Sequence, residues 1–234
     1  MREVWQRVSG RAYMKQGKPI AASLEHLVFC PAKPSNNCAT LVALHGRGTD
    51  ANDLVPLVLA LGLDDILLFA PRAPLPFSLG VGFAWYGLNE VGVPQPQTFR
   101  ASLDLLRNFI LEIKKGYPVD PERLILLGFS QGTVMAYAAA LLDPDSFRGI
   151  AALSGYVPIK SGLPLQLEKL NGLSAFISHG MYDEIIPVQF GRESAEFLKK
   201  AGAHVVYREY AMGHEVSEET LRDLAVWTKN LLSR

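Results

Sequence analysis

The clearest sign of chemistry in this sequence is a serine between two glycines, in the segment Gly128-Phe129-Ser130-Gln131-Gly132. The apolar residues 124–127 precede this segment, and the largely apolar residues 133–142 follow it. A buried strand, a sharp turn and a helix in this order form the G-x-S-x-G pattern of a nucleophile elbow, which presents the serine hydroxyl at the end of the strand. The turn brings backbone segments so close together that the flanking positions tolerate little besides glycine. We therefore interpret Ser130 as an activated nucleophile rather than as a serine in an ordinary glycine-rich turn.

A serine hydroxyl needs a base to take its proton, and histidine suits this task because its unperturbed pKa is about 6.5. Among the five histidines, His214 is the favoured base. It lies in a loop after the last predicted strand, and the loops that leave parallel strands gather at one edge of the sheet. His45 and His179 end predicted central strands and stay as alternative bases, although each also suits the bracing of a loop.

The base needs an acceptor behind it, which fixes its tautomer and stabilises its charged form. Asp183 follows the strand before the last one, and it completes the chain order Ser, Asp, His of an α/β-hydrolase. Glu184 is the neighbouring alternative. We favour Asp183, because the apolar residues 185–187 that follow Glu184 have the character of a buried anchor.

Acyl transfer also needs two donors for the oxyanion of a tetrahedral intermediate. The elbow pattern assigns one of them to the backbone N–H of Gln131. The second is expected from the loop after the first central strand, at the backbone N–H of Arg47. Glycines on both sides of Arg47 let that loop turn tightly. Only the amide of Arg47 is required, and the alternative is that Arg47 is an exposed loop residue without a role.

The elements that must position these residues follow from the hydrophobic pattern. From about residue 40, short apolar runs alternate with longer amphipathic runs, which predicts a mostly parallel central sheet with helices on both faces. The predicted strands of this sheet cover residues 40–45, 66–70, 124–127, 149–154, 174–179 and 204–210. Residues 11–14 and 23–29 predict an antiparallel hairpin before them. Helices are expected to begin near Asn52 or Asp53, Thr98, Pro187 and Ser217, and residues 1–234 to form a single domain.

Residues 71–97 form a long stretch rich in proline, glycine and aromatic residues. Such stretches are unusual in compact domains and are often functional. Its aromatic side chains either form an exposed apolar wall at the edge of the sheet or pack against one another. The candidate substrate contacts, which favour an acyl chain or an aromatic acid over a charged substrate, are Trp85, Tyr86, Tyr156, Met181 and Ile186.

Composition excludes several classes of partner. Lysine and arginine together number 23, as do aspartate and glutamate, so nothing indicates attraction to nucleic acid or to an anionic membrane. Cys30 and Cys38 lack the spacing of metal ligands, and we expect free thiols. The N-terminus is charged where a signal peptide needs an apolar stretch, and no apolar run reaches the roughly 18 residues of a membrane span. These features predict a cytoplasmic protein.

Several motifs in order along the chain resemble the phospholipase/carboxylesterase family of small α/β-hydrolases, which includes the acyl-protein thioesterases. The resemblance covers about residues 20–232 and rests on His45-Gly46-Arg47-Gly48, Asn52-Asp53-Leu54, residues 70–74, Ala84-Trp85-Tyr86, residues 128–132, His179-Gly180 with Asp183, and Gly213-His214. It implies an α/β-hydrolase fold and a serine hydrolase that needs no cofactor or metal. The triad of the family maps to Ser130, Asp183 and His214, and its oxyanion amides to Arg47 and Gln131.

One position departs from the family pattern. Many members have a second glycine after the elbow, where this chain has Thr133. This departure leaves the triad intact and raises the question of how Thr133 packs beside the serine. Because many members dimerise, the resemblance also raises a homodimer as a hypothesis by analogy.

These observations predict a carboxylesterase that acts on a small-molecule ester or thioester through an acyl-enzyme on Ser130. Acyl-protein thioesterase and lysophospholipase are the alternative activities of the same chemistry. An acyltransferase with the same triad and a non-catalytic binding module are the alternatives from other classes. Kinetics with and without an alcohol acceptor separate the transferase from the hydrolase.

Overall fold

The computed structural model of the chain describes residues 5–8, 12–31, 35, 38–63, 65–77 and 80–233. Its strands are β1 (Trp5–Val8), β2 (Ala12–Gln16), β3 (His26–Pro31), β4 (Cys38–Leu44), β5 (Ile66–Pro71), β6 (Leu75–Pro76), β7 (Phe83–Ala84), β8 (Leu88–Glu90), β9 (Val93–Pro94), β10 (Val119–Phe129), β11 (Gly149–Leu153), β12 (Ser174–Gly180) and β13 (His204–Tyr210). Its α-helices are α1 (Val55–Ala60), α2 (Pro96–Gly116), α3 (Gln131–Leu142), α4 (Val188–Lys200) and α5 (Glu218–Leu232). Short 3₁₀ helices cover Pro144–Ser146, Ile159–Ser161 and Leu167–Gly172.

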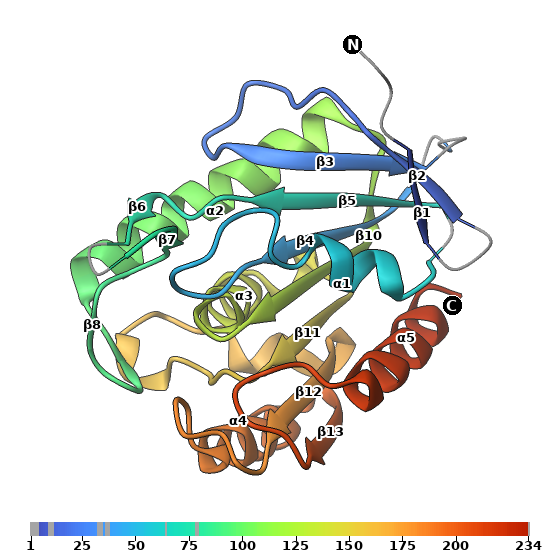
Figure 1. Cartoon of the computed structure of the whole chain (residues 1–234). Coiled ribbons are helices and arrows are strands. Elements are labelled where there is room, and N and C mark those ends of the chain that lie inside the picture. Colours follow the sequence, from blue (N-terminus) through green and yellow to red (C-terminus); the bar gives the residue numbers. More distant parts are fainter. Residues whose placement is uncertain are drawn as a thin grey trace.

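Nine of the strands form one sheet, in the order β1-β2-β3-β5-β4-β10-β11-β12-β13. All neighbouring pairs from β5 to β13 in this order are parallel, whereas β1, β2 and β3 join the sheet antiparallel. This arrangement confirms the predicted mostly parallel sheet with antiparallel strands at its N-terminal side (Figure 1). Since β4, β10, β12 and β13 run in the same direction, the loops that follow them leave from one edge of the sheet.

Each face of the sheet carries its own apolar core. In β10, Leu124 and Leu126 belong to one core, and Ile125 and Leu127 belong to the other, because successive side chains of a strand point to opposite faces. Helices α2, α3 and α4 complete the first core, and α1 and α5 complete the second (Figure 1). The prediction of helices on both faces is therefore confirmed.

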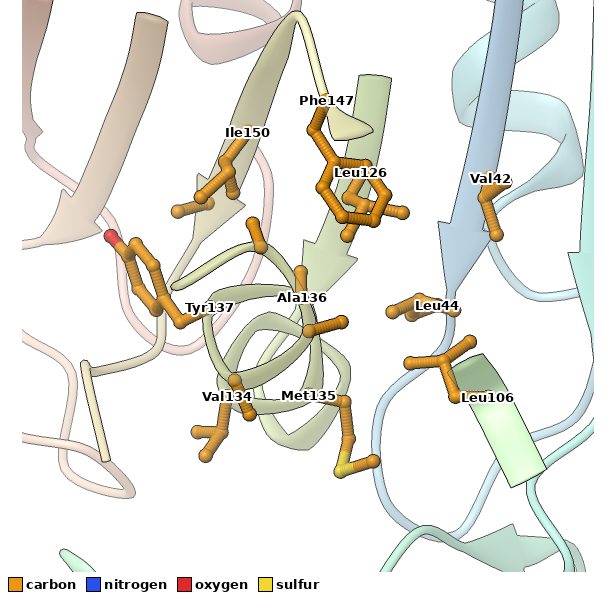
Figure 2. Close-up of a cluster of buried hydrophobic side chains, with 14 of the residues drawn as sticks. Val42, Leu44, Leu106, Leu126, Val134, Met135, Ala136, Tyr137, Phe147 and Ile150 are labelled. Carbon is orange, nitrogen blue, oxygen red and sulfur yellow. The ribbon is translucent and has the colours of Figure 1, made fainter. Parts of the chain in front are cut away.

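Helix α3 is the most deeply enclosed element of the first core. Its residues 131–141 are all buried, and a helix that is apolar all round is typical of a protein interior. Figure 2 shows its side chains among those of the neighbouring strands and of α2, with Val134, Met135, Ala136 and Tyr137 beside Leu44, Leu106, Leu126 and Ile150. The surroundings of α3 therefore fix the position of its first turn, which carries the predicted nucleophile.

Several predicted boundaries differ from the structure: α1 begins at Val55, after Asn52 and Asp53, and β10 is longer than the predicted residues 124–127. Helix α2 begins at Pro96, two residues before Thr98, because proline is tolerated in the first turn of a helix. The Thr98 hydroxyl instead accepts from Gly87 N at 3.0 Å and donates to Gln95 O at 3.2 Å. The N-terminal hairpin consists of β2 and β3, each slightly displaced from its predicted range, and Arg11 lies outside the described residues.

Residues 71–97 are less irregular than their composition predicts. Strands β6 and β7 form one small antiparallel pair, and β8 and β9 form another. Phe83 also forms an isolated antiparallel bridge with Thr49, in the loop after β4. This bridge attaches the stretch to the loop that contains Arg47.

The remaining sequence predictions concern cysteines and membranes. Cys30 and Cys38 are free thiols, as predicted. Within the described ranges, no helix combines the length and the apolar character that crossing a bilayer requires.

We predict that Gly132→Ala strongly destabilises the protein. A Cβ at Gly132 would overlap the carbonyl oxygen of Leu44 in β4, and neither backbone has space to retreat in this packed core. Such overpacking is expected to lower the free energy of unfolding by about 3 kcal/mol, measured by urea denaturation. Gly172→Ala is the matched control, because nothing lies within 4 Å of the Cβ it would add. Equal denaturation midpoints for the two variants would contradict the prediction.

Candidate active site

Ser130 occupies the turn between β10 and α3 in a conformation that few residues adopt. Its backbone has φ 54° and ψ −117°, and positive φ in a residue other than glycine indicates strain. The amide of Ser130 donates to Leu153 O at 2.9 Å, and its carbonyl accepts from Thr133 N at 3.0 Å. A Cβ at Gly128 would lie about 2.5 Å from the Gly132 carbonyl carbon, so the two flanking backbones are in direct contact. The local structure expected for a nucleophile elbow is therefore present.

His214 and Asp183 form a short contact at the same edge of the sheet. His214 Nδ1 lies 2.7 Å from Asp183 Oδ2. The other carboxylate oxygen, Oδ1, accepts from the amides of Ile185 at 2.9 Å and Ile186 at 2.8 Å. The Asp183 side chain is completely buried. Its two backbone donors fix the orientation of the carboxylate, so that Oδ2 is the oxygen that faces His214.

The ring of Phe129 brings His214 next to the elbow. Phe129 directly precedes Ser130, and its ring centroid lies 4.9 Å from that of His214. Ser130, Asp183 and His214 follow β10, β12 and β13, respectively, at the edge where these parallel strands end. The structure thus gathers the three residues predicted as a triad into one region. Glu184, the alternative acid, is exposed beside Asp183.

The loop after β4 passes beside the serine. A Cβ at Gly46 would lie 3.7 Å from Ser130 Cβ and 3.1 Å from Phe129 Cδ1, so Gly46 packs closely against the elbow and leaves little space for a side chain. Arg47 is the next residue, and its guanidinium stacks over the ring of Phe77 with 4.9 Å to the centroid. Gly48 has φ 82° and donates its amide to Phe83 O at 2.8 Å. The backbone of Arg47 is therefore held between Ser130 and the stretch of residues 71–97.

Gln131 has two separate roles in this region. Its backbone N–H is the first in α3, where an amide has no carbonyl of its own helix to bind. Its side chain reaches the other way, since Oε1 accepts from Trp85 N at 2.7 Å and Nε2 donates to Tyr86 O at 2.7 Å. The sequence predicted the role of the amide and missed the side-chain clamp. No local pattern signals this clamp, because its partners lie 46 and 45 residues away along the chain.

His45 braces two loops. Its Nδ1 lies 2.7 Å from Gly46 O, which can only accept, so Nδ1 carries the proton. Its Nε2 accepts from Ala73 N at 3.0 Å. Burial lowers the pKa of His45, although the bond to Gly46 O acts in the opposite direction. Both ring nitrogens are therefore occupied, and this geometry matches the bracing role rather than the alternative role as the base.

His179 lies behind Asp183 and is fully buried. Its Nε2–H donates to Ile186 O at 2.7 Å and lies 3.5 Å from Asp183 Oδ2. Burial lowers the pKa of this ring, so its neutral form is favoured. A Cβ at Gly191 would collide with the ring, which explains the glycine at that position of α4. His179 therefore supports the loop of residues 183–186, and the sequence alone left this role as one of two alternatives.

The predicted substrate contacts divide into three groups. Trp85 and Tyr86 are 0% and 1% exposed and belong to the first apolar core, which favours the alternative in which the aromatic residues of this stretch pack inward. The indole N–H of Trp85 donates to His45 O at 3.0 Å, which shows that residues 83–87 pack inward. Met181 is exposed, whereas Ile186 is buried in the first apolar core. Tyr156 is also largely buried but borders a cavity of about 290 Å³.

That cavity lies between the loop after β11 and the start of α4. Its lining combines apolar and polar side chains: Tyr156, Ile159, Phe190 and Phe197 with Lys160, Glu193 and Ser194. The rings of Tyr156 and Phe190 lie 5.3 Å apart. A Cβ at Gly155, the residue before Tyr156, would lie 3.0 Å from Ser130 O. Gly155 is therefore close to the elbow, whereas neither Ser130 nor His214 lines the cavity.

Comparison with known proteins supports this description. A family described as Phospholipase/Carboxylesterase matches residues 25–232. Acyl-protein thioesterase 1 of Candida albicans is 31% identical over 224 residues, which cover 87% of this chain and 96% of that protein. A probable carboxylesterase of Arabidopsis thaliana, SOBER1-like, is 29% identical over 69% of this chain and 65% of that protein.

Solved structures have the same fold. A carboxylesterase from Mesorhizobium loti superposes with a TM-score of 0.80 at 22% identity, over 92% of this chain and 98% of that chain. The L63A variant of SOBER1 from Arabidopsis thaliana gives a TM-score of 0.70 at 26% identity, over 84% of this chain and 99% of that chain. These likenesses bear out the predicted fold of an α/β-hydrolase.

We predict that acid destabilises the protein through His45 and His179. Burial lowers the pKa of both rings in the folded state, whereas an unfolded histidine has a pKa of about 6.5. Below about pH 6.5 the unfolded chain binds more protons than the folded protein does. The contribution of each neutral histidine to the free energy of unfolding is therefore complete above about pH 6.5, and it is lost as the pH falls through the lowered folded pKa. The free energy of unfolding should fall by up to about 1.4 kcal/mol per pH unit for each histidine.

Urea denaturation at several pH values between about 7.5 and 5 measures this slope. In His179→Gln the slope should be smaller, because glutamine does not titrate. A slope identical to that of the unaltered protein would show that His179 does not contribute.

Proposed function

Because the chain belongs to the phospholipase/carboxylesterase family, we propose that it is a serine hydrolase that cleaves carboxylic esters through an acyl-enzyme on Ser130. The observation that carries this proposal is the 2.7 Å contact of Asp183 with His214, beside a serine in the strained backbone of a nucleophile elbow. Ser130 is the nucleophile, His214 the general base and Asp183 the acid that orients it.

The geometry around Asp183 supports the assignment of the base. A carboxylate oxygen accepts hydrogen bonds, so Oδ2 holds the proton of His214 on Nδ1. The lone pair of Nε2 is then the one that receives the proton of the Ser130 hydroxyl. As His214 becomes positively charged, the buried carboxylate stabilises the charge at short range. Because Asp183 is held by two backbone amides, it needs no rearrangement when this charge forms.

In the first half of the reaction, Ser130 Oγ forms a bond to the carbonyl carbon of the ester, and its proton moves to His214. The backbone N–H groups of Arg47 and Gln131 stabilise the resulting oxyanion. His214 then gives the proton to the leaving alcohol as the ester bond breaks. In the second half, His214 takes a proton from water as the water oxygen bonds to the acyl carbon. The bond from that carbon to Ser130 Oγ then breaks, His214 returns the proton to Oγ, and the carboxylic acid leaves.

The relatives carry two kinds of name, carboxylesterase and acyl-protein thioesterase. The same steps cleave an oxygen ester, a thioester or a lysophospholipid, because only the leaving group differs. A preference for an apolar acyl group stays a prediction, because the cavity beside Tyr156 and Phe190 is not lined by Ser130 or His214. An acyltransferase would use the same residues and deliver the acyl group to an alcohol, so the products formed in the presence of an alcohol distinguish it.

Three further predictions belong to this proposal. The sheet that extends from β1 to β13, together with the family match over residues 25–232, supports a single hydrolase domain over residues 1–234.

The second prediction is a cytoplasmic location, which the free thiols of Cys30 and Cys38 support because the cytoplasm is reducing. A homodimer stays a prediction by analogy with the family.

We predict that a fluorophosphonate phosphonylates Ser130 with loss of fluoride. Mass spectrometry of the digested protein should find one label, on the peptide that contains Ser130. Ser130→Ala should take up no label and lose at least about 10⁴-fold in kcat toward p-nitrophenyl esters, because the nucleophile is absent. Full activity without a label, or a label on another residue, would refute the proposal.

We predict that Asp183→Asn lowers kcat by about 10⁴-fold without unfolding the protein. The amides of Ile185 and Ile186 should retain the carbonyl oxygen of the new asparagine, which places its NH₂ group against His214 Nδ1. His214 would then carry its proton on Nε2 and could not accept the proton of serine. Glu184→Gln is the matched control at the exposed neighbouring position and should keep near-normal kcat. If the two variants lost activity equally, Asp183 would not be the acid.

A further inference from the structure

The strained conformation of Ser130 needs support from its surroundings. A positive φ in a residue other than glycine costs of the order of 1–3 kcal/mol and persists only where neighbouring groups hold it. The amide of Ser130 is held by one acceptor, Leu153 O at the end of β11. The position of that carbonyl therefore controls the backbone from which the serine hydroxyl projects.

The hydroxyl of Thr133 contacts the same carbonyl. Thr133 Oγ1 lies 2.7 Å from Leu153 O and 2.6 Å from Gly128 O, and it accepts from Leu153 N at 3.2 Å. Since a hydroxyl has a single proton, it donates to one of the two carbonyl oxygens while the other stays within reach. Thr133 is fully buried, so no water competes for these contacts. One side chain in the first turn of α3 thus links that helix to both β10 and β11.

The opposite wall of this site is shaped to receive the threonine. A Cβ at Gly155 would overlap Thr133 Cβ and would lie about 2.5 Å from its Cγ2. Gly155 therefore leaves the space that the threonine side chain fills, directly beside Ser130 O. A glycine at position 133, which many members of the family have, could make none of the three hydroxyl contacts.

We propose that Thr133 is a positioning residue, whose hydroxyl holds the end of β11 against the elbow and thereby keeps Ser130 in its reactive conformation. This inference rests on the proposed function. Thr133 is enclosed by backbone and does not reach the substrate, so its loss is expected to lower kcat and to leave KM nearly unchanged. A displacement of the nucleophile by about 1 Å can cost roughly 10²-fold in rate.

The test compares Thr133→Ser with Thr133→Ala, because both lack the methyl group and only the serine keeps the hydroxyl. Active sites are counted by fluorophosphonate titration, and kcat is expressed per titrated site toward a p-nitrophenyl ester. We expect Thr133→Ser to stay within about 3-fold of the unaltered enzyme and Thr133→Ala to lose about 10- to 100-fold in kcat, with slower phosphonylation.

A matched control separates positioning from stability. Thr228 in α5 is also a buried threonine, and its hydroxyl donates to Leu224 O at 2.8 Å in the second core. Thr228→Ala should destabilise the fold to a similar extent and keep its kcat per titrated site. If Thr133→Ala does not fold, Thr133→Gly replaces it, because glycine fits this position without overlap.

Equal kcat per titrated site in the serine variant and the hydroxyl-free variant would overturn the proposal. An equal loss in Thr228→Ala would also overturn it, since the effect would then follow stability alone. Failure of the proposed function itself gives a different result, because the unaltered protein would then show no phosphonylation of Ser130.

Discussion

The close approach of two backbones at the end of β10 is the constraint on which this structure depends. Gly128 and Gly132 are in contact across the turn, and Gly132 also touches the carbonyl of Leu44 in the neighbouring strand. This packing leaves Ser130 no relaxed conformation, and the enclosure of α3 prevents the helix from moving away. The apolar core on this face therefore does more than stabilise the fold, since it maintains a geometry that an isolated turn would not keep.

Environment, rather than residue type, separates the histidines. His45 and His179 are buried, have lowered pKa values and bind backbone carbonyls, so each serves as a neutral link between loops. His214 alone of these three pairs closely with a carboxylate, and it keeps part of its ring exposed. His45 and His214 follow β4 and β13, and His179 lies near the end of β12, so position along the chain did not distinguish them. The hydrogen-bond partners of each ring in the structure distinguish the three histidines.

The sequence was sufficient wherever a short pattern has one physical solution. Gly128, Ser130 and Gly132 predicted the elbow, because few residues tolerate that backbone, and the alternating runs predicted the parallel sheet. It failed where an outcome depends on contacts between distant segments. The sequence left open whether Trp85 forms an exposed wall or packs inward, and it lies in the core, where its amide donates to Gln131, 46 residues away. The contacts of Thr133 with β11 likewise depend on a strand whose position the local sequence does not encode.

Gln131 connects two parts of the molecule that are otherwise described separately. Its side chain binds the backbone at Trp85 and Tyr86, while its main chain begins the helix behind the nucleophile. A ligand that pushed residues 85–86 aside would have to break two buried hydrogen bonds or move Gln131 with them. Binding at that segment and the alignment of the Gln131 amide are therefore thermodynamically linked, and their coupling free energy is the same in both directions.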